Sequence, residues 1–218
     1  MTGAFKPVLR KNSAEYGGSV EVIWMSGAPE EAERFRKHME QLHTAYLQMF
    51  PQEEERLARL KTCIERGEAL HARTTMTGHV TASAYILAPD RQCLLLVYHR
   101  ALEDWLAPGG HYEARDGVLS RCAQREAQEE TGIEVLSLDA WHDRLAIPID
   151  IDIHRIPANP IKGEVEHDHF DCRYVFHALT TAIRSDPTEV SAVEWRPLAS
   201  IGPQENAYPV VQKIQRFL

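Results

Sequence analysis

The amino-acid sequence predicts an α/β fold of the α+β kind, in which β-strands surround one central helix. Short apolar segments of strand length recur between residues 80 and 195. Among them, Val118–Thr131 has helical apolar spacing and is followed by Gly132, a residue common just past a helix end. A second helical pattern, Tyr208–Leu218, closes the chain. This order predicts a sandwich of sheet and helix layers, and the 218 residues suffice for one such domain with a substantial extension.

Residues 1–69 are predicted to form a mainly helical N-terminal extension. Within it, Val20–Met25 alternates enough to predict a short strand. A helix capped by Ser26 is expected next, because apolar residues then recur at three- or four-residue spacing until Pro51 breaks the pattern. A second helix is expected from Gln52 to about Arg66. The charged residues of this part are most simply explained as solvated helix faces.

Residues 70–218 are predicted to form a second unit, and most of its segments are strand-like. Apolar and β-branched residues alternate or run continuously in these segments, and turns such as Pro89-Asp90 separate them. In chain order, the predicted strands are Val80–Ala88, Cys93–His99, Ile133–Leu138, Ile149–Ile156, Phe170–Leu179 and Val190–Trp195.

The chain is acidic, and its composition is that of a globular protein. It contains 32 Asp and Glu against 24 Lys and Arg, a net charge of −8, and 44% of its residues are hydrophobic. An acidic chain is a poor candidate for nonspecific nucleic-acid binding, but a bound divalent metal would let it bind a phosphate substrate. No apolar run approaches the roughly 20 residues that span a bilayer, so we expect no membrane partner. The four cysteines form no C-x-x-C pair, which indicates reduced thiols in the cytoplasm.

Three glutamates share one face of the predicted central helix. Glu126, Glu129 and Glu130 stand at i, i+3 and i+4, so their carboxylates project from the same side. Their like charges repel, and a hard divalent cation such as Mg²⁺, which prefers oxygen ligands, would remove that penalty. Arg125 lies about 100° around the helix from Glu126 and is expected to hold a glutamate in place from the side. Taken alone, the glutamates are also compatible with a plain exposed acidic face.

The stretch Gly110–Ile133 resembles the Nudix box, G-x5-E-x7-R-E-U-x-E-E-x-G-U, in which U is a bulky aliphatic residue. The core R-E-x-x-E-E-x-G-U forms the last nine residues of the stretch, and a Pro-Gly-Gly turn opens it. The sequence departs from the box in three places. Asp116 replaces the first glutamate, eight residues instead of seven separate it from Arg125, and Ala127 occupies the first aliphatic position of the core. The likeness covers about residues 70–218, where further segments resemble a subgroup of bacterial Nudix proteins.

The Nudix resemblance implies a fold, a reaction and a metal. The fold is an α/β/α sandwich with a mixed sheet. The reaction is hydrolysis of a pyrophosphate bond in a nucleoside diphosphate linked to another group, with Mg²⁺ or Mn²⁺ as the cofactor. Carried onto this chain, the resemblance implies that Glu126 and Glu130 bind the metal. Glu129 would be a third ligand or would orient the water, and the carbonyl of Gly110 would be a further ligand.

The resemblance leaves the general base open. Glu129 is the first choice, because it lies in the box itself. Glu164 or Glu166, in the loop before the strand that begins near residue 169, is the second choice. A carboxylate close to bound metal is expected to be ionised at neutral pH.

Several histidines are candidates for substrate contacts. His167, His169 and Asp171 alternate at strand spacing, so their side chains are expected to share one face. With the two glutamates just before them, they are expected to form a polar cluster opposite the box helix. The cluster would contact substrate phosphates or hold an accessory metal, or else be an ordinary polar strand edge. His79 begins a strand and His111 follows the glycine turn, so both are candidates to line the site.

Two other functions stay open at this point. A Nudix-fold regulatory module would bind a nucleotide metabolite without cleaving it, but it would have no need for three box glutamates. A Nudix-type isomerase of isopentenyl diphosphate would use a cysteine near the site, and neither Cys93 nor Cys172 sits in a matching motif. The N-terminal extension would dock on its own domain or on a second copy of the chain, and we favour a homodimer.

Overall fold

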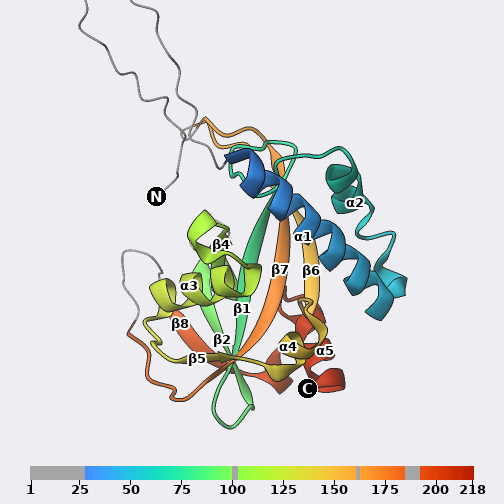
Figure 1. Cartoon of the computed structure of the whole chain (residues 1–218). Coiled ribbons are helices and arrows are strands. Elements are labelled where there is room, and N and C mark those ends of the chain that lie inside the picture. The colour runs from blue at the N-terminus through green and yellow to red at the C-terminus, as the bar shows by residue number, and fades with distance from the viewer. Residues whose placement is uncertain (1–27, 100–102, 161–162, 185–191) are drawn as a thin grey trace, which may run out of the picture.

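The computed structural model describes residues 28–99, 103–160, 163–184 and 192–218. It confirms the predicted α+β class, with a mixed sheet and helices packed against it (Figure 1). The predicted strand Val20–Met25 and the predicted cap Ser26 lie outside the described residues. In the described ranges, no helix combines the length and the apolar character that a membrane span needs.

Two parallel strands form the centre of an eight-stranded sheet. β1 (His79–Leu87) runs beside β7 (His167–Ala178) over its whole length, as Figure 1 shows. The two ends of β1 have different second neighbours. β4 (Gly109–His111) pairs antiparallel with the first half of β1, and β2 (Cys93–His99) pairs antiparallel with its last two residues. The start of β1 therefore lies between β4 and β7.

The remaining strands extend the sheet from β2 and β7. β6 (Asp150–Ile156) and β5 (Leu136–Leu138) pair antiparallel with the first and last parts of β7. β3 (Asp104–Leu106) and β8 (Val193–Pro197) both pair antiparallel with β2. Both parallel and antiparallel pairs occur, so the sheet is mixed as predicted.

The central helix occupies the place expected for it. α3 (Leu119–Thr131) packs against β1 and β4. It ends at Gly132, whose φ of 66° lies in the left-handed region. A Cβ atom at residue 132 would approach the carbonyl oxygen of Arg184 to 2.3 Å, so this cap also needs glycine for its close contact. α5 (Tyr208–Phe217) closes the chain and contacts β6.

Short elements differ most from the sequence prediction. β3, β4 and the six-residue α4 (Ala140–Leu145) were not predicted, because such short segments show no periodicity. The strand predicted at Ile133–Leu138 begins only at Leu136, since Ile133 turns into the core directly after the helix cap. The strand predicted at Phe170–Leu179 begins earlier, at His167. The first two residues of the strand predicted at Val190–Trp195 lie outside the described residues, and β8 begins at Val193.

The N-terminal helices join the same hydrophobic core as the sheet. α1 (Ala28–Met49) buries the predicted apolar face except for Met49, which is exposed at the end of the helix, and the Phe35 ring lies 4.7 Å from that of Tyr112 in the second unit. The second predicted helix was wrong in its start. α2 spans only Ala58–Glu65, because Pro51–Glu53 forms a 3₁₀ turn that buries no side chain.

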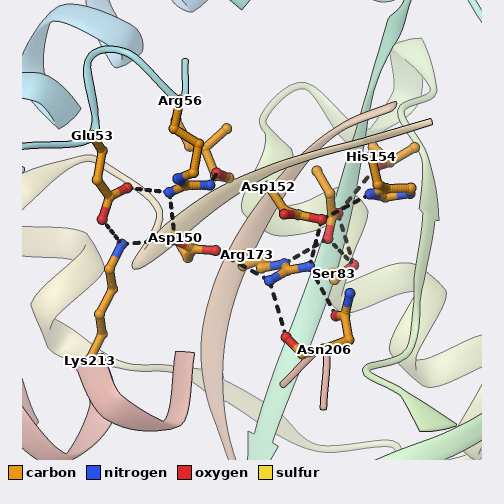
Figure 2. Close-up of polar contacts among 12 residues, drawn as sticks. Glu53, Arg56, Ser83, Asp150, Asp152, His154, Arg173, Asn206 and Lys213 are labelled. Atoms are coloured by element: carbon orange, nitrogen blue, oxygen red, sulfur yellow. Dashed lines mark hydrogen bonds and ion pairs between the residues drawn. The ribbon is translucent and has the colours of Figure 1, made fainter. Parts of the chain in front are cut away.

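A buried network of charges connects these helices to the sheet (Figure 2). The Asp150 carboxylate on β6 accepts from Arg173 at 3.2 Å and from Lys213 of α5 at 2.8 Å. Arg56, just before α2, lies 3.1 Å from the same carboxylate and also donates to the carbonyl of Ile151. Burial raises the pKa of Asp150, but Arg173, Lys213 and Arg56 outweigh it and hold that pKa below its ordinary value.

Arg173 is the cation at the centre of this network. Its side chain is 3% exposed. It lies 3.1 Å from Asp171 and 3.0 Å from Asp152, and it donates to the side-chain oxygen of Asn206 at 2.9 Å. Arg173 therefore pairs with three aspartates, and Lys213 and Arg56 share the charge of Asp150.

Replacing Arg173 is expected to destabilise the protein strongly. Arg173→Ala leaves buried carboxylates uncompensated, and breaking a buried ion pair in this way costs about 3–5 kcal/mol. Urea unfolding of the Arg173→Ala variant and of the unmodified chain measures this loss of stability. Arg36→Ala, which removes a surface ion pair with Glu33 on α1, is the control and is expected to leave the midpoint nearly unchanged. Equal midpoints for Arg173→Ala and the unmodified chain would contradict the role given to this network.

Candidate functional site

The box glutamates meet the glycine turn at strand β4. The backbone N–H of Gly109 donates to the Glu130 carboxylate at 3.2 Å. The Cα of Gly110 faces Glu126 so closely that an added Cβ would lie 2.5–2.7 Å from the atoms of the Glu126 carboxylate. The predicted helix face and the predicted turn are thus packed directly together.

Arg125 connects the helix, the strand and the preceding loop. Its guanidinium lies 2.8 Å from Glu126 and 3.1 Å from Glu129. It also donates to the backbone carbonyl of His111 at 3.0 Å. The sequence predicted that this arginine would hold a glutamate from the side, and it contacts two of the three.

Asp116 completes the environment of Arg125. Both of its carboxylate oxygens accept from the guanidinium, at 2.8 and 3.0 Å, and one also accepts from the Glu113 N–H at 2.8 Å. Burial raises the pKa of Asp116, but the hydrogen bonds from Arg125 and from the Glu113 backbone outweigh it and hold the pKa below its ordinary value. The shorter acid therefore reaches the arginine despite the longer loop.

The carboxylates of the site have an excess of negative charge. Burial raises the pKa of Glu126, the charges of Glu129 and Asp116 add to that rise, and Arg125 opposes it without cancelling it. A divalent cation would stabilise the ionised form, and carboxylate and carbonyl oxygens are the ligands that Mg²⁺ and Mn²⁺ prefer. The donor set of Glu126, Glu130 and the Gly110 carbonyl fits such an ion.

The three candidates for the general base lie in different surroundings. Glu129 shares the helix face of the box, is 46% exposed, and lies 3.6 Å from Arg115. Glu164 pairs with Arg73 at 3.1 Å, and Glu166 pairs with Arg155 at 2.9 Å. Glu129 is the candidate that the structure places among the other box carboxylates.

The predicted histidines lie together on one face of the sheet. β1 and β7 pair in a register that sets His79 beside His169, and β4 sets His111 beside Thr81. The centroid of the His79 ring lies 5.0 Å from that of His111, 4.7 Å from that of His169 and 4.9 Å from that of His167. Side chains alternate along a strand, and Tyr174, on the other face of β7, interacts with Cys122 of α3. The histidine face is therefore the sheet face turned away from the box helix.

Asp171 lies on the same face but belongs to the buried charge network. It accepts from Ser83 at 2.8 Å and from Thr81 at 3.2 Å, and it pairs with Arg173. Sequence reasoning did not single out Arg173, although its position two residues after Asp171 places both on one strand face.

His154 was not among the predicted substrate residues, yet it adjoins the histidines. Its ring centroid lies 5.4 Å from that of His169, and its Nδ1 is 3.0 Å from a carboxylate oxygen of Asp152. Its alternation with Asp150 and Asp152 was the signal that could have placed it on this face.

Comparisons with known proteins agree with the motif. The family model of the NUDIX domain matches residues 77–216, well over half of the chain. A Lactococcus lactis protein named "Probable DHNTP pyrophosphohydrolase" is 31% identical over 96 residues, which cover 44% of this chain and 52% of that protein. The chain thus spans about half the length of this curated relative.

Solved structures give similar matches at lower identity. A NUDIX-family hydrolase from Clostridium perfringens is 20% identical, with a TM-score of 0.46 over 64% of this chain and 98% of that one. The dihydroneopterin triphosphate pyrophosphohydrolase of Escherichia coli is 17% identical, with a TM-score of 0.44 over 63% of this chain and 93% of that one.

Two adjacent glycines provide a matched pair of variants. The three atoms nearest to a Cβ at Gly110 all belong to the Glu126 carboxylate, the far end of a side chain, so we expect Gly110→Ala to fold with nearly unchanged stability but to bind Mn²⁺ about tenfold or more weakly. Gly109→Ala places its Cβ 2.6 Å from the Ala82 carbonyl oxygen, so we expect a loss of about 1–3 kcal/mol in stability. Thermal unfolding measures the stability of both variants, and Mn²⁺ titration followed by electron paramagnetic resonance measures their affinity for Mn²⁺. Unchanged Mn²⁺ affinity in folded Gly110→Ala would be evidence against a metal site at Glu126.

Proposed function

The chain belongs to the NUDIX domain family, and from this premise we propose that it hydrolyses a pyrophosphate bond in a small nucleoside diphosphate derivative, using Mg²⁺ or Mn²⁺. The observation that carries the proposal is the packing of Glu126 and Glu130 against the turn Gly109–Gly110, with Glu129 on the same helix face. A purely structural acidic face would be exposed to water, whereas Glu126 is largely buried beside Arg125. Burying like charges in this way is costly unless a cation balances them.

The residues that would hold the metal are Glu126, Glu130 and the carbonyl of Gly110, and Glu129 would be a third ligand only if it is not the general base. A bound divalent cation supplies Lewis-acid activation of water and neutralises charge on phosphate oxygens. Arg125 keeps Glu126 and Glu129 in place through its two hydrogen bonds. Asp116 in turn fixes the plane of the guanidinium by a two-oxygen contact.

Glu129 is the residue we assign as general base. Its exposure leaves room for a water molecule, and Arg125 orients one of its oxygens at 3.1 Å. Glu129 takes a proton from the attacking water, whose oxygen forms a new bond to phosphorus while the bridging P–O bond breaks. Glu164 and Glu166 remain the alternatives, but each is paired with an arginine elsewhere.

The substrate is proposed to be a small molecule, because the net charge of −8 disfavours polymeric nucleic acid. Dihydroneopterin triphosphate belongs among the first compounds to test, since the Lactococcus lactis relative is named for it. The proposal also includes a cytoplasmic location and a homodimer. His79, His111, His167, His169 and Asp171 stay the residues proposed for substrate contacts, and because they lie on the sheet face opposite the box helix, they would contact a part of the substrate away from the reacting phosphates.

Glu130→Gln tests the proposed reaction. We expect metal-dependent release of products from at least one compound in a library of nucleotide sugars, dinucleoside polyphosphates, nucleoside triphosphates, coenzymes and pterin triphosphates. Loss of one metal-binding carboxylate is expected to lower kcat/KM about 100-fold or more. Glu134→Gln, an exposed glutamate just after the same helix, is the control and is expected to keep full activity.

Two results would contradict the proposal. One is full activity of folded Glu130→Gln. The other is no turnover of any diphosphate by the metal-loaded chain, together with a bound nucleotide that survives incubation with Mg²⁺. The second result would favour the nonhydrolytic binding module.

The choice of general base is tested separately. Glu129→Gln is expected to lower kcat about 10²–10⁴-fold with little change in KM, because a base acts on the chemical step. Glu164→Gln and Glu166→Gln are expected to stay within a few-fold of the unmodified chain. If one of these two loses kcat while Glu129→Gln keeps it, the base lies in that loop and the assignment of Glu129 is wrong.

A further inference from the structure

Three histidines from three strands converge on the sheet face opposite the box helix. His79 opens β1, His111 ends β4, and His169 lies on β7. One ring nitrogen from each lies within 4.8 Å of the other two. We propose that these histidines form a second metal site, which binds a divalent transition ion such as Zn²⁺ and is separate from the carboxylate site.

The spacing of the nitrogens suits a shared ion. The Nε2 atoms of His79 and His111 are 3.1 Å apart. Two imidazole nitrogens bound to one tetrahedral Zn²⁺ at about 2.0–2.1 Å lie about 3.3 Å from each other. The rings of His79 and His111 therefore need only a small adjustment to share an ion, and His169, whose nitrogen lies within 4.8 Å of both, would move closer to them.

The hydrogen bond on the far side of His79 also suits a metal ligand. Its Nδ1 lies 3.2 Å from the carbonyl oxygen of Thr75. A carbonyl can only accept, so this geometry calls for a proton on Nδ1 and leaves the lone pair on Nε2. Metal-binding histidines commonly donate their other ring N–H to a backbone carbonyl in this way.

A simple hydrogen-bonded cluster leaves one buried nitrogen without a partner. His79 and His111 can satisfy each other's Nε2 by one hydrogen bond. The Nε2 of His169 is buried and has no hydrogen-bond partner among the described residues. Buried polar atoms are nearly always paired. An ion bound by the three rings would give a partner to one nitrogen of each ring, including the Nε2 of His169.

The donors favour a different ion from the carboxylate site. Three neutral imidazoles are typical ligands of Zn²⁺, Co²⁺ or Ni²⁺, whereas Mg²⁺ selects oxygen. Three protein ligands also leave a coordination position open for water or one anionic oxygen. The ring nitrogens that lie within 4.8 Å of one another belong to His79, His111 and His169. The neighbouring rings of His154 and His167, with centroids 5.4 and 5.2 Å from that of His169, form the wall of the site.

Strand β4 separates the two proposed metal sites. Gly110 faces the box carboxylates, and the next residue, His111, turns its ring to the other face. The His111 carbonyl still accepts from Arg125. The histidine site does not depend on the proposed hydrolysis, so each can be tested without the other.

Metal binding to the untagged full chain tests the proposal. The chain is stripped with a chelator and titrated with Co²⁺ in a large excess of Mg²⁺, and bound metal is read from visible absorption and from the metal-to-protein ratio. We expect one Mg²⁺-resistant ion per chain, displaced by Zn²⁺. His169→Ala and His111→Ala are expected to weaken Co²⁺ binding about tenfold or more. Circular dichroism checks that each variant is folded, and one folded variant of the two is enough for the test.

Matched variants separate this site from the other. His71→Ala removes a histidine that packs on Phe35 and is not one of the three with converging ring nitrogens, and it should bind Co²⁺ unchanged. Glu130→Gln should also bind it unchanged while losing hydrolysis. The proposal is overturned if excess Mg²⁺ abolishes Co²⁺ binding, or if a folded His169→Ala or His111→Ala variant binds Co²⁺ as tightly as the unmodified chain.

Discussion

The candidate site depends on how one guanidinium distributes its positive charge. Arg125 contacts Asp116, Glu126 and Glu129 and also holds the carbonyl of His111. Acids from the loop and from the helix are thus fixed relative to strand β4 by a single side chain. Arg115 also approaches Glu129, at 3.6 Å, yet Glu126 still has a raised pKa because it is buried and lies among like charges. This remaining negative charge is the physical reason for assigning a metal to the site.

The same constraint operates on the other side of the sheet, where it serves the fold. Arg173 balances Asp150, Asp152 and Asp171, and Lys213 and Arg56 share the charge of Asp150 (Figure 2). This network is closed by protein cations, so it needs no external ion. It ties the segment before α2 and the last helix to β6 and β7. The helices before residue 70 are therefore held by both apolar packing and buried charge.

The sequence allowed the site to be predicted better than its surroundings. Glutamates at i, i+3 and i+4 on a periodic helix are a local pattern, and so is the capping Gly132, so both could be located before the fold was known. The convergence of His79, His111 and His169 could be predicted only in part. It depends on the parallel pairing of β1 with β7, whose residues are about ninety positions apart in the chain. Arg56 reaches Asp150 across a similar separation, so no local spacing could indicate how the extension docks.

Strand β4 separates the two proposed metal sites, one with oxygen ligands and one with imidazole nitrogens. Anomalous diffraction from crystals soaked in Mn²⁺ and Zn²⁺ tests this separation most directly. A Mn²⁺ peak is expected beside Glu126 and Glu130, near the Gly110 carbonyl, and a Zn²⁺ peak among His79, His111 and His169. Mn²⁺ bound away from the box glutamates, or Zn²⁺ absent from the three histidines, would contradict the account.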